Sequence, residues 1–435
     1  MSNLTVNGDA QLQTTISTAA RRYFELGVIV IAAGAIYPLL YLRQNFEVSI
    51  LGSFGITLTQ LSQCYAMLGV IFVVTYVPSG WLTDRVSPRI LLTLSLATTG
   101  LLGLWFSTIP SFAMLQVIFA GWGMTTGLTF WSAHIKAVSL LADPQEQGRF
   151  FGMLDGGRGL FEALLATIAV AWFAYAIESQ GDSTRQALLD VIYFYVAVLL
   201  VLAPVVYLAL GDMKPNNEKQ ATGVSLKSDK SNFFADLKRV LNNREIWLCA
   251  VIIICGYQLF WATYSFSGYL QNTLGMTAVA VGSITVAKLW MRPIGAAAAG
   301  FAGDFLDRQH VLTVLLVLAS ASLASIAFLP DIAATFLVLT VVLLIGLLTY
   351  AVRGVYWATL DSCNVPDRIK GLAIGVISLI GYSPDIYLPL LNSALLEAYP
   401  GRTGYAIYFV GLSVMGLLGA LAAWQLGRRI RALKV

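Results

Sequence analysis

Residues 80–89 read Gly-Trp-Leu-Thr-Asp-Arg-Val-Ser-Pro-Arg, and residues 300–308 read Gly-Phe-Ala-Gly-Asp-Phe-Leu-Asp-Arg. Each stretch follows a long apolar segment and places an Asp four positions after its first Gly. The two first glycines, Gly80 and Gly300, lie 220 positions apart. The same short polar motif therefore occurs twice in the chain.

A second pair of matching positions supports an internal duplication. Gly152 and Glu162 correspond to Gly375 and Asp385, with an offset of 223 positions in both cases. Two independent matches at nearly one offset predict a parallel repeat of one helical unit, which is a known plan among membrane transporters.

The composition indicates a protein that lies largely in lipid. Hydrophobic residues make up 57% of the 435-residue chain and charged residues only 11%, against about a quarter in soluble domains. The net charge of +4 is small, and without basic runs it predicts no nucleic-acid partner. The four cysteines lack metal-ligand spacing, so we expect reduced packing residues, no metal and no cofactor.

Twelve segments are long and apolar enough to cross a bilayer, which takes about 20 residues. We therefore predict an all-α membrane protein with twelve transmembrane helices in two pseudo-symmetric six-helix bundles. Residues 1–210 form the N-terminal bundle, the polar residues 211–245 a cytoplasmic linker, and residues 246–435 the C-terminal bundle. The predicted helices cover residues 22–42, 57–82, 89–108, 112–139, 149–177, 187–210, 246–271, 277–302, 311–329, 333–360, 370–395 and 404–426.

The Lys and Arg residues orient these helices, because positive loops favour the cytoplasmic side. With both termini inside, the inner loops and tails hold nineteen of the 27 positive residues. The outer loops hold three, Arg43, Arg185 and Arg402. We predict a multi-pass protein of the bacterial inner (plasma) membrane with both termini in the cytoplasm. The first 20 residues lack a signal-peptide core, so the first helix is expected to stay uncleaved.

The two Gly-x-x-x-Asp motifs resemble the signature of the major facilitator superfamily (MFS), which reads roughly Gly-x-x-x-Asp-Arg-x-Gly-Arg-Lys after the second helix. Ser87 and Pro88 depart from it, since Gly and Arg are usual there. The twelve helices, the linker and the duplication extend the resemblance over nearly the whole chain, without resolving a subfamily. It implies the MFS fold and transport by alternating access. The matching positions, which we expect to form a cytoplasmic gate, are Gly80, Asp84, Arg85, Arg89, Gly300, Asp304 and Arg308.

The gating role has a physical basis and a simpler alternative. Glycine permits close helix approach, and an Asp at a helix end can pair with Arg or accept from helix N-terminal amides. Such contacts can close one side in one state and break in the other. Alternatively, these are ordinary loop charges that only set the topology.

Charged residues recur inside the predicted helices, where they are costly and usually face a cavity or a partner. Asp155, Arg158 and Glu162 share one face of the fifth helix, so Arg158 can pair with both carboxylates. Lys288 and Arg292 share one face of the eighth helix. The alternative is a buried ion-pair network that only holds helices together.

Two further ionisable residues lie at membrane depth. Arg353 lies in the tenth predicted helix, and Asp385 lies between two prolines in the eleventh. Cations outnumber acids among these residues, and a positive cavity favours an anionic solute. We expect the carboxylates Asp155, Glu162 and Asp385 to carry a coupling proton.

The resemblance implies that helices 1, 4, 7 and 10 line the central cavity, and aromatic residues are concentrated on them here. Rings with polar tips suit an organic solute, although ordinary packing would also place them there. The expected substrate-binding residues are Arg158, Lys288, Arg292, Arg353, Tyr37, Trp131, Tyr257, Trp261 and Trp357.

No nucleotide-binding loop or catalytic constellation is present in the sequence, so we expect neither ATP drive nor an enzyme. The leading hypothesis is proton-coupled transport of a small organic anion, such as a carboxylate, a sugar acid or a phosphorylated compound. The partners are then the solute, a proton and the bilayer, and the protein is expected to be a monomer. The alternatives are a transporter of neutral sugars or amphipathic drugs, and a transport-dead solute sensor.

Overall fold

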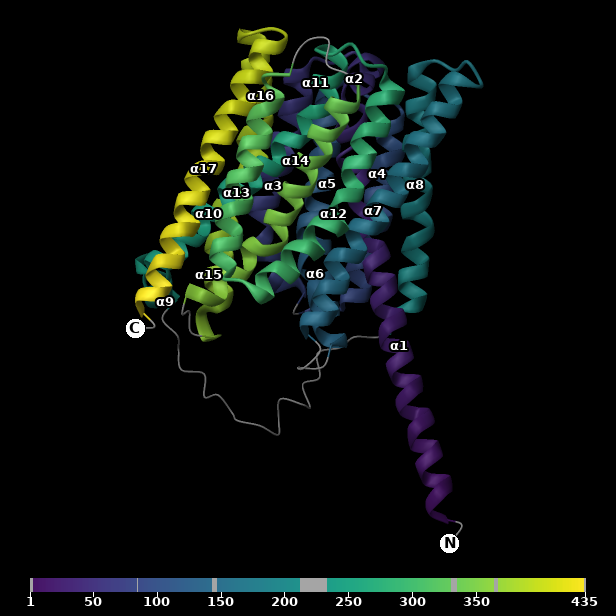
Figure 1. The fold of residues 1–435 in the computed structure, drawn as a ribbon. Coiled ribbons are helices and arrows are strands. Elements are labelled where there is room, and N and C mark those ends of the chain that lie inside the picture. The colour runs from purple at the N-terminus through teal and green to yellow at the C-terminus, as the bar shows by residue number, and fades with distance from the viewer. Residues whose placement is uncertain are drawn as a thin grey trace.

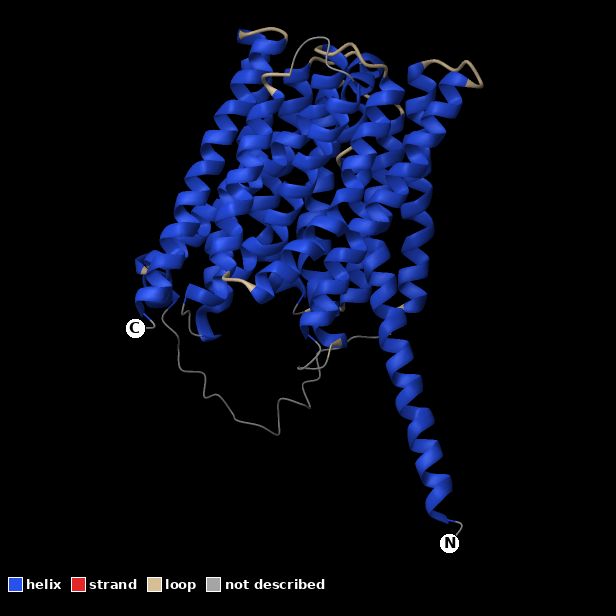
Figure 2. Ribbon diagram, viewed as in Figure 1, coloured by secondary structure: helices blue, strands red, loops and turns tan. Residues whose placement is uncertain are grey.

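The computed structural model describes residues 3–83, 85–142, 147–211, 233–329, 335–363 and 367–433. Throughout this part of the chain the regular structure is helical (Figure 2). The helices run side by side in one bundle, and the first helix begins and the last helix ends on the same side of it (Figure 1). We call this side the terminal side and the opposite one the far side; the charge distribution predicts that the terminal side is cytoplasmic.

The helices before the polar linker form what we call the N-terminal half. They are α1 (Asn3–Leu40), α2 (Arg43–Phe54), α3 (Leu58–Thr83), α4 (Pro88–Ser107), α5 (Phe112–Gly123), the π-helix η1 (Met124–Trp131), α6 (Ser132–Leu141), α7 (Gln147–Glu178) and α8 (Thr184–Ala209).

The short helix α9 (Phe233–Asn242) precedes the C-terminal half. This half contains α10 (Arg244–Ala262), the 3-10 turn η2 (Thr263–Ser265), α11 (Phe266–Asn272), α12 (Ala278–Phe305), α13 (Arg308–Ile326), α14 (Thr335–Tyr356), the 3-10 helix η3 (Trp357–Cys363), α15 (Asp367–Gly381), α16 (Pro384–Ala398) and α17 (Arg402–Leu433).

The predicted all-α membrane fold is confirmed. Eleven stretches of the described chain are long and apolar enough to cross a membrane, and the 28-residue α12 is also of membrane length. Several crossings are built from consecutive pieces, such as α5, η1 and α6, or α10, η2 and α11. The predicted division into two domains stays a prediction, and residues 212–232 of the predicted linker lie outside the described residues.

The first crossing differs from its prediction. α1 ends at Leu40, but after a turn the chain continues as α2 to Phe54, which is well beyond the predicted end at residue 42. Arg43, predicted in an outer loop, is buried with 1% of its surface exposed. The pattern of apolar residues stops at residue 42, so only packing against the other half shows that the next turns are buried. Gly55 ends α2 in the left-handed conformation (φ 65°), which glycine adopts without strain.

Glycines let the two halves approach closely. α3 packs against α16, α7 against α12, and α2 against α11. A Cβ atom at Gly69 of α3 would lie 2.7 Å from the carbonyl carbon of Asp385. A Cβ at Gly268 of α11 would fall against Glu47 Oε1 and within 2.7 Å of the Tyr405 hydroxyl. Both of these contacts between the halves therefore require glycine, because any side chain would collide with the other half.

Candidate substrate-binding site

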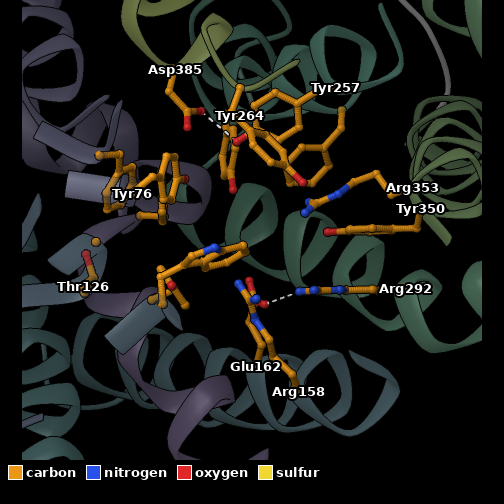
Figure 3. Close-up of a pocket in the computed structure, with 17 residues that line it drawn as sticks. Tyr76, Thr126, Arg158, Glu162, Tyr257, Tyr264, Arg292, Tyr350, Arg353 and Asp385 are labelled. Atoms are coloured by element: carbon orange, nitrogen blue, oxygen red, sulfur yellow. Dashed lines mark hydrogen bonds and ion pairs between the residues drawn. The ribbon is translucent and has the colours of Figure 1, made fainter. Parts of the chain in front are cut away.

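A cavity lies between the two halves and takes its walls from both (Figure 3). Its volume in this conformation is about 80 Å³, below the range of about 300–1,000 Å³ that is typical of small-molecule sites. The lining residues are Tyr37, Tyr41, Phe72, Tyr76, Thr126, Gly127, Trp131, Arg158, Glu162, Tyr257, Phe260, Tyr264, Arg292, Tyr350, Arg353, Tyr382 and Asp385.

The π-helix η1 forms one wall of the cavity through Thr126, Gly127 and Trp131. π-Helical turns are rare and often occur at functional sites. Gly127 is needed here because a Cβ would collide with the Thr75 hydroxyl of α3. The Thr126 hydroxyl donates to the Trp122 carbonyl at 2.6 Å. The wider turn and the glycine together seat this wall against α3.

Arg292 of α12 crosses the interface and pairs with carboxylates of α7. Its Nη1 lies 2.5 Å from Glu162 Oε2, and its Nη2 lies 3.5 Å from Asp155 Oδ1. The Glu162 pair is drawn in Figure 3. The Asp155 side chain is 63% exposed, so its contact is the weaker one. The predicted pairing of Arg158 with both carboxylates is therefore wrong for this conformation. Gly159 explains the difference, because a Cβ there would lie 2.8 Å from Arg292 Cδ.

Arg158 and Arg353 reach into the same cavity from opposite halves (Figure 3). The Arg158 guanidinium lies 4.5 Å from the Tyr37 ring centre, and that of Arg353 lies 4.1 Å from the Phe260 ring centre. Within the described parts of the chain, neither forms a hydrogen bond or an ion pair, and Arg158 Nε is buried without an acceptor. The cavity thus holds two cations without carboxylate partners.

Asp385 lies where the eleventh crossing is broken between α15 and α16. Its Oδ1 accepts hydrogen bonds from the Tyr257 hydroxyl at 2.7 Å and from Trp261 Nε1 at 2.5 Å. Pro384 opens α16 directly before it, and proline is favoured in the first helical turn. The break therefore presents a hydrogen-bonded carboxylate at the cavity wall.

Three predicted substrate ligands do not line the cavity. Lys288 is fully buried, and its Nζ donates to Thr263 Oγ1 at 3.1 Å. Trp261 lies behind the wall, where it holds Asp385. Trp357 Nε1 donates to the Tyr382 hydroxyl at 3.0 Å. The predicted residues Tyr37, Trp131, Arg158, Tyr257, Arg292 and Arg353 do line it.

The sequence reasoning missed Tyr76, Tyr350 and Tyr382, which also line the cavity. Tyr350 lies three positions before Arg353 on one face of α14, so helical spacing from a charged residue could have identified it. No comparable signal marks Tyr382, because it lies in the turn between α15 and α16.

Aromatic rings and a buried ion pair lie where the first crossing meets the other half. The Tyr41 and Tyr264 rings, one from each half, stack at 5.3 Å between centres. Nearby, Arg43 Nε lies 2.7 Å from Glu47 Oε2, and each side chain is 1% exposed. The Arg43 guanidinium faces the Trp261 ring of the other half at 5.9 Å. Arg43 and Glu47 were both missed as buried residues by the sequence reasoning.

The predicted gating motif is only partly visible. Asp84, the side chain of Asp304 and the surroundings of Gly300 lie outside what the structure describes. A Cβ at Gly80 would meet no atom within 4 Å, so close packing does not require this glycine in the present conformation. The Arg89 guanidinium lies 3.9 Å from the Tyr207 ring centre.

Two contacts next to the motif residues lie at helix ends, one at the end of α3 and one at the start of α13. Lys136 of α6 donates to the Thr83 carbonyl at the end of α3 at 2.8 Å, where a cation is favourable. Arg85 is exposed, and Arg308 opens α13 behind the cap formed by Asp307. The gating role of the motif remains a prediction.

Comparison with known proteins identifies relatives over nearly the whole chain. The inner membrane protein YqcE of Escherichia coli is 28% identical over 407 residues, which cover 92% of this chain and 93% of that protein. The inner membrane protein YihN of the same organism is 24% identical over 415 residues, which cover 94% and 96%.

Solved structures share the fold. A bacterial homologue of the human lysosomal transporter Spinster, in an inward-facing and unoccupied conformation, aligns with a TM-score of 0.70 at 13% identity, over 94% of this chain and 97% of that one. A mutant of the nucleoside transporter NupG aligns with a TM-score of 0.69 at 12% identity, over 92% and 98%. At these identities the likeness shows the fold alone.

The family model of the Major Facilitator Superfamily matches residues 26–389, which is most of the chain. This match confirms the resemblance carried by the duplicated motif and the twelve predicted helices. The chain is therefore a multi-pass membrane protein with inner-membrane relatives, it is not an enzyme, and it belongs to the Major Facilitator Superfamily of secondary transporters.

Proposed function

We propose that this secondary transporter carries a small organic anion and couples its movement to protons. The observation that supports the anion is the pair Arg158 and Arg353, which face one cavity from opposite halves without hydrogen-bond or ion-pair partners among the described residues. A cation at membrane depth is costly without a partner. An anion that contacts both guanidinium groups would complete the site.

The chemistry of the lining supports an oxygen-rich solute. The planar guanidinium fork matches carboxylate and phosphate oxygens. Tyrosine hydroxyl groups can bond further oxygens, while their rings pack against a carbon skeleton. A carboxylate, a sugar acid or a phosphorylated compound fits this lining. The tyrosines of the cavity are Tyr37, Tyr41, Tyr76, Tyr257, Tyr264, Tyr350 and Tyr382.

Alternating access follows from the division of the site between the halves. Arg158 belongs to α7 and Arg353 to α14. An anion that binds both contributes more binding energy when the halves approach on the terminal side, so it favours a closed state over an open one. The solute is thereby occluded before the far side opens.

Competition for Arg292 supplies the coupling. Glu162 holds this guanidinium at 2.5 Å in the present conformation. A substrate anion that takes Arg292 leaves the Glu162 carboxylate without a counter-charge, and a proton then neutralises it. Substrate and proton are loaded together by this exchange. Asp385 is the second candidate for a coupling carboxylate, since it also lines the cavity.

A thermal-shift screen of the purified protein tests the anion. The panel contains organic anions, neutral sugars and cationic amphiphiles, because a ligand that binds the native state raises the melting temperature. Hits are repeated with Arg158→Ala and Arg353→Ala. Lys288→Met is the matched control, since it removes a buried cation that does not line the cavity.

We expect stabilisation by anions that both arginine variants lose and the Lys288 variant keeps. Stabilisation by neutral sugars or amphiphiles alone would refute the anion and favour one of those classes. Counterflow of the same ligand in proteoliposomes separates a transporter from a transport-dead sensor, which binds the solute without exchanging it.

A further inference from the structure

A second, smaller cavity lies behind Glu162. Its polar walls are Gln44 and Asn45 of α2, Glu162 of α7 and Tyr195 of α8, and apolar side chains close the rest. Its volume is about 10 Å³, which is the size at which a buried space can hold one water molecule.

Glu162 belongs to both cavities. Its Oε2 contacts Arg292 on the side of the central cavity. Tyr41, the other residue common to both, stacks on Tyr264. Together Glu162 and Tyr41 form the partition between the central cavity of about 80 Å³ and the smaller cavity of about 10 Å³.

The small cavity contains an unsatisfied polar group. Asn45 Oδ1 is buried without a hydrogen-bond donor, and the Asn45 side chain is more than nine-tenths buried. A buried acceptor without a donor costs about 1–3 kcal/mol. A water molecule that donates to Asn45 Oδ1 would remove this cost, and it could also bond to Glu162 and Tyr195, which meets the two to four partners a buried water needs.

The broken first crossing explains why these polar side chains are buried here. α1 ends at Leu40 and α2 begins at Arg43, and Phe46 has a non-helical backbone (φ −133°, ψ 30°). Non-helical backbone at membrane depth is tolerated where it lines a cavity. The same two turns carry the buried pair of Arg43 and Glu47, so buried polar side chains are concentrated in this part of the first crossing.

We propose that this small cavity is a water-binding site through which Glu162 exchanges its proton, separately from the route of the solute. In the transfer, a protonated water gives H⁺ to the free carboxylate oxygen of Glu162, a new O–H bond forms, and a neutral water remains. The inference rests on the proposed proton-coupling role of Glu162. It adds that proton and substrate reach this residue from different sides.

Several ionisable groups face Glu162 and define its surroundings. Arg158 lies on its own helix, and Arg292 and Lys288 come from α12. Tyrosines approach from four other elements, and they are Tyr37, Tyr195, Tyr264 and Tyr350. Of these groups, Tyr195 is the one that lines the small cavity.

Infrared difference spectra between neutral and acidic pH, recorded on the purified full chain without substrate, test this route, because acid protonates the carboxylate that Arg292 otherwise holds ionised. The band of the protonated Glu162 carboxyl is assigned by its loss in Glu162→Gln, and its deuterium exchange is timed after transfer to heavy water. Asn45→Leu keeps the branching and the number of heavy atoms of the side chain but removes both polar atoms. We expect the band to persist in this variant while its exchange slows about tenfold, the effect of one lost hydrogen bond of about 1.4 kcal/mol.

Two further variants keep the test decisive. Tyr195→Phe removes only a hydroxyl and should also slow the exchange. Asn392→Leu should leave it unchanged, because Asn392 is a buried amide without partners that lies in α16, away from the cavity. Unchanged exchange in Asn45→Leu and Tyr195→Phe would overturn the water route and leave the coupling role intact. Absence of any Glu162 band would overturn both, while the thermal-shift screen would still decide the anion.

Discussion

Glu162 of α7 and Arg292 of α12 form an ion pair of 2.5 Å that joins the two halves at the wall of the central cavity. The Arg292 side chain is 10% exposed and that of Glu162 is 17% exposed, so the pair is shielded from most screening by salt. Any movement that separates α7 from α12 must break it or replace one partner. The pairing of the Glu162 carboxylate is therefore linked to the conformation of the whole transporter.

Replacing Glu162 by Gln should uncouple transport. Because Gln cannot take up a proton, we expect proteoliposomes with Glu162→Gln to lose proton-driven accumulation and to keep counterflow exchange of the solute. Glu178→Gln is the control, since it makes the same change at the exposed end of the same helix. Accumulation that survives in Glu162→Gln would exclude this residue as the coupling site.

Replacing Arg158 or Arg353 by Lys should weaken anion binding even though the charge remains. A lysine ammonium cannot form the two parallel hydrogen bonds of a guanidinium, and a hydrogen bond between charged groups contributes about 1.5–3 kcal/mol. We expect the dissociation constant for the anion to rise about 10- to 100-fold, as measured by calorimetry. If both lysine variants bind the anion as tightly as the unchanged protein does, the positive potential of the cavity determines binding and the guanidinium geometry does not.

Removing one partner of the Arg43–Glu47 pair should destabilise the protein strongly. Both side chains are 1% exposed, and an uncompensated buried charge costs about 3–5 kcal/mol. We expect Arg43→Met and Glu47→Gln each to lower the melting temperature. The double variant Arg43→Met with Glu47→Gln should recover part of this loss, because no lone charge remains. Additive losses in the double variant would show that the two residues do not act as a pair.

Adding a methyl group at Gly69 should disturb the seam between α3 and α16. A Cβ at this position would lie 2.7 Å from the backbone of Asp385, where no flexible side chain can move away. We expect Gly69→Ala to lower the melting temperature of the protein, because the present packing of α3 against α16 cannot accommodate the methyl group. Gly411→Ala is the control, since this exposed helical glycine of α17 has no atom within 4 Å of a Cβ. That change should be neutral or stabilise the helix by up to about 1 kcal/mol. If Gly69→Ala is equally harmless, the contact does not constrain the seam.

The helix count, the duplicated motif and the family were all predictable from the sequence. Membrane spans need long apolar runs, and the motif positions from Gly80 to Arg89 are contiguous in the chain. Such signals are local in the sequence, so they can be recognised without knowing which helices are in contact. The lining residues on one helical face, such as Arg158 and Glu162 of α7 or Tyr350 and Arg353 of α14, follow from helical spacing once one member is recognised.

What the sequence by itself determined is the set of membrane helices and the charged residues within the apolar runs that it predicted, but not Arg43 and Glu47, because the bilayer imposes length and composition on each segment separately. Only the tertiary structure decided which charges meet. Glu162 pairs with Arg292, 130 positions away, but not with Arg158, which lies only four positions away on the same helix. Lys288 faces Thr263 instead of the cavity. Helical periodicity defines the faces of one helix. The rotation and crossing of neighbouring helices, permitted here by Gly69 and Gly159, select the partner of each face.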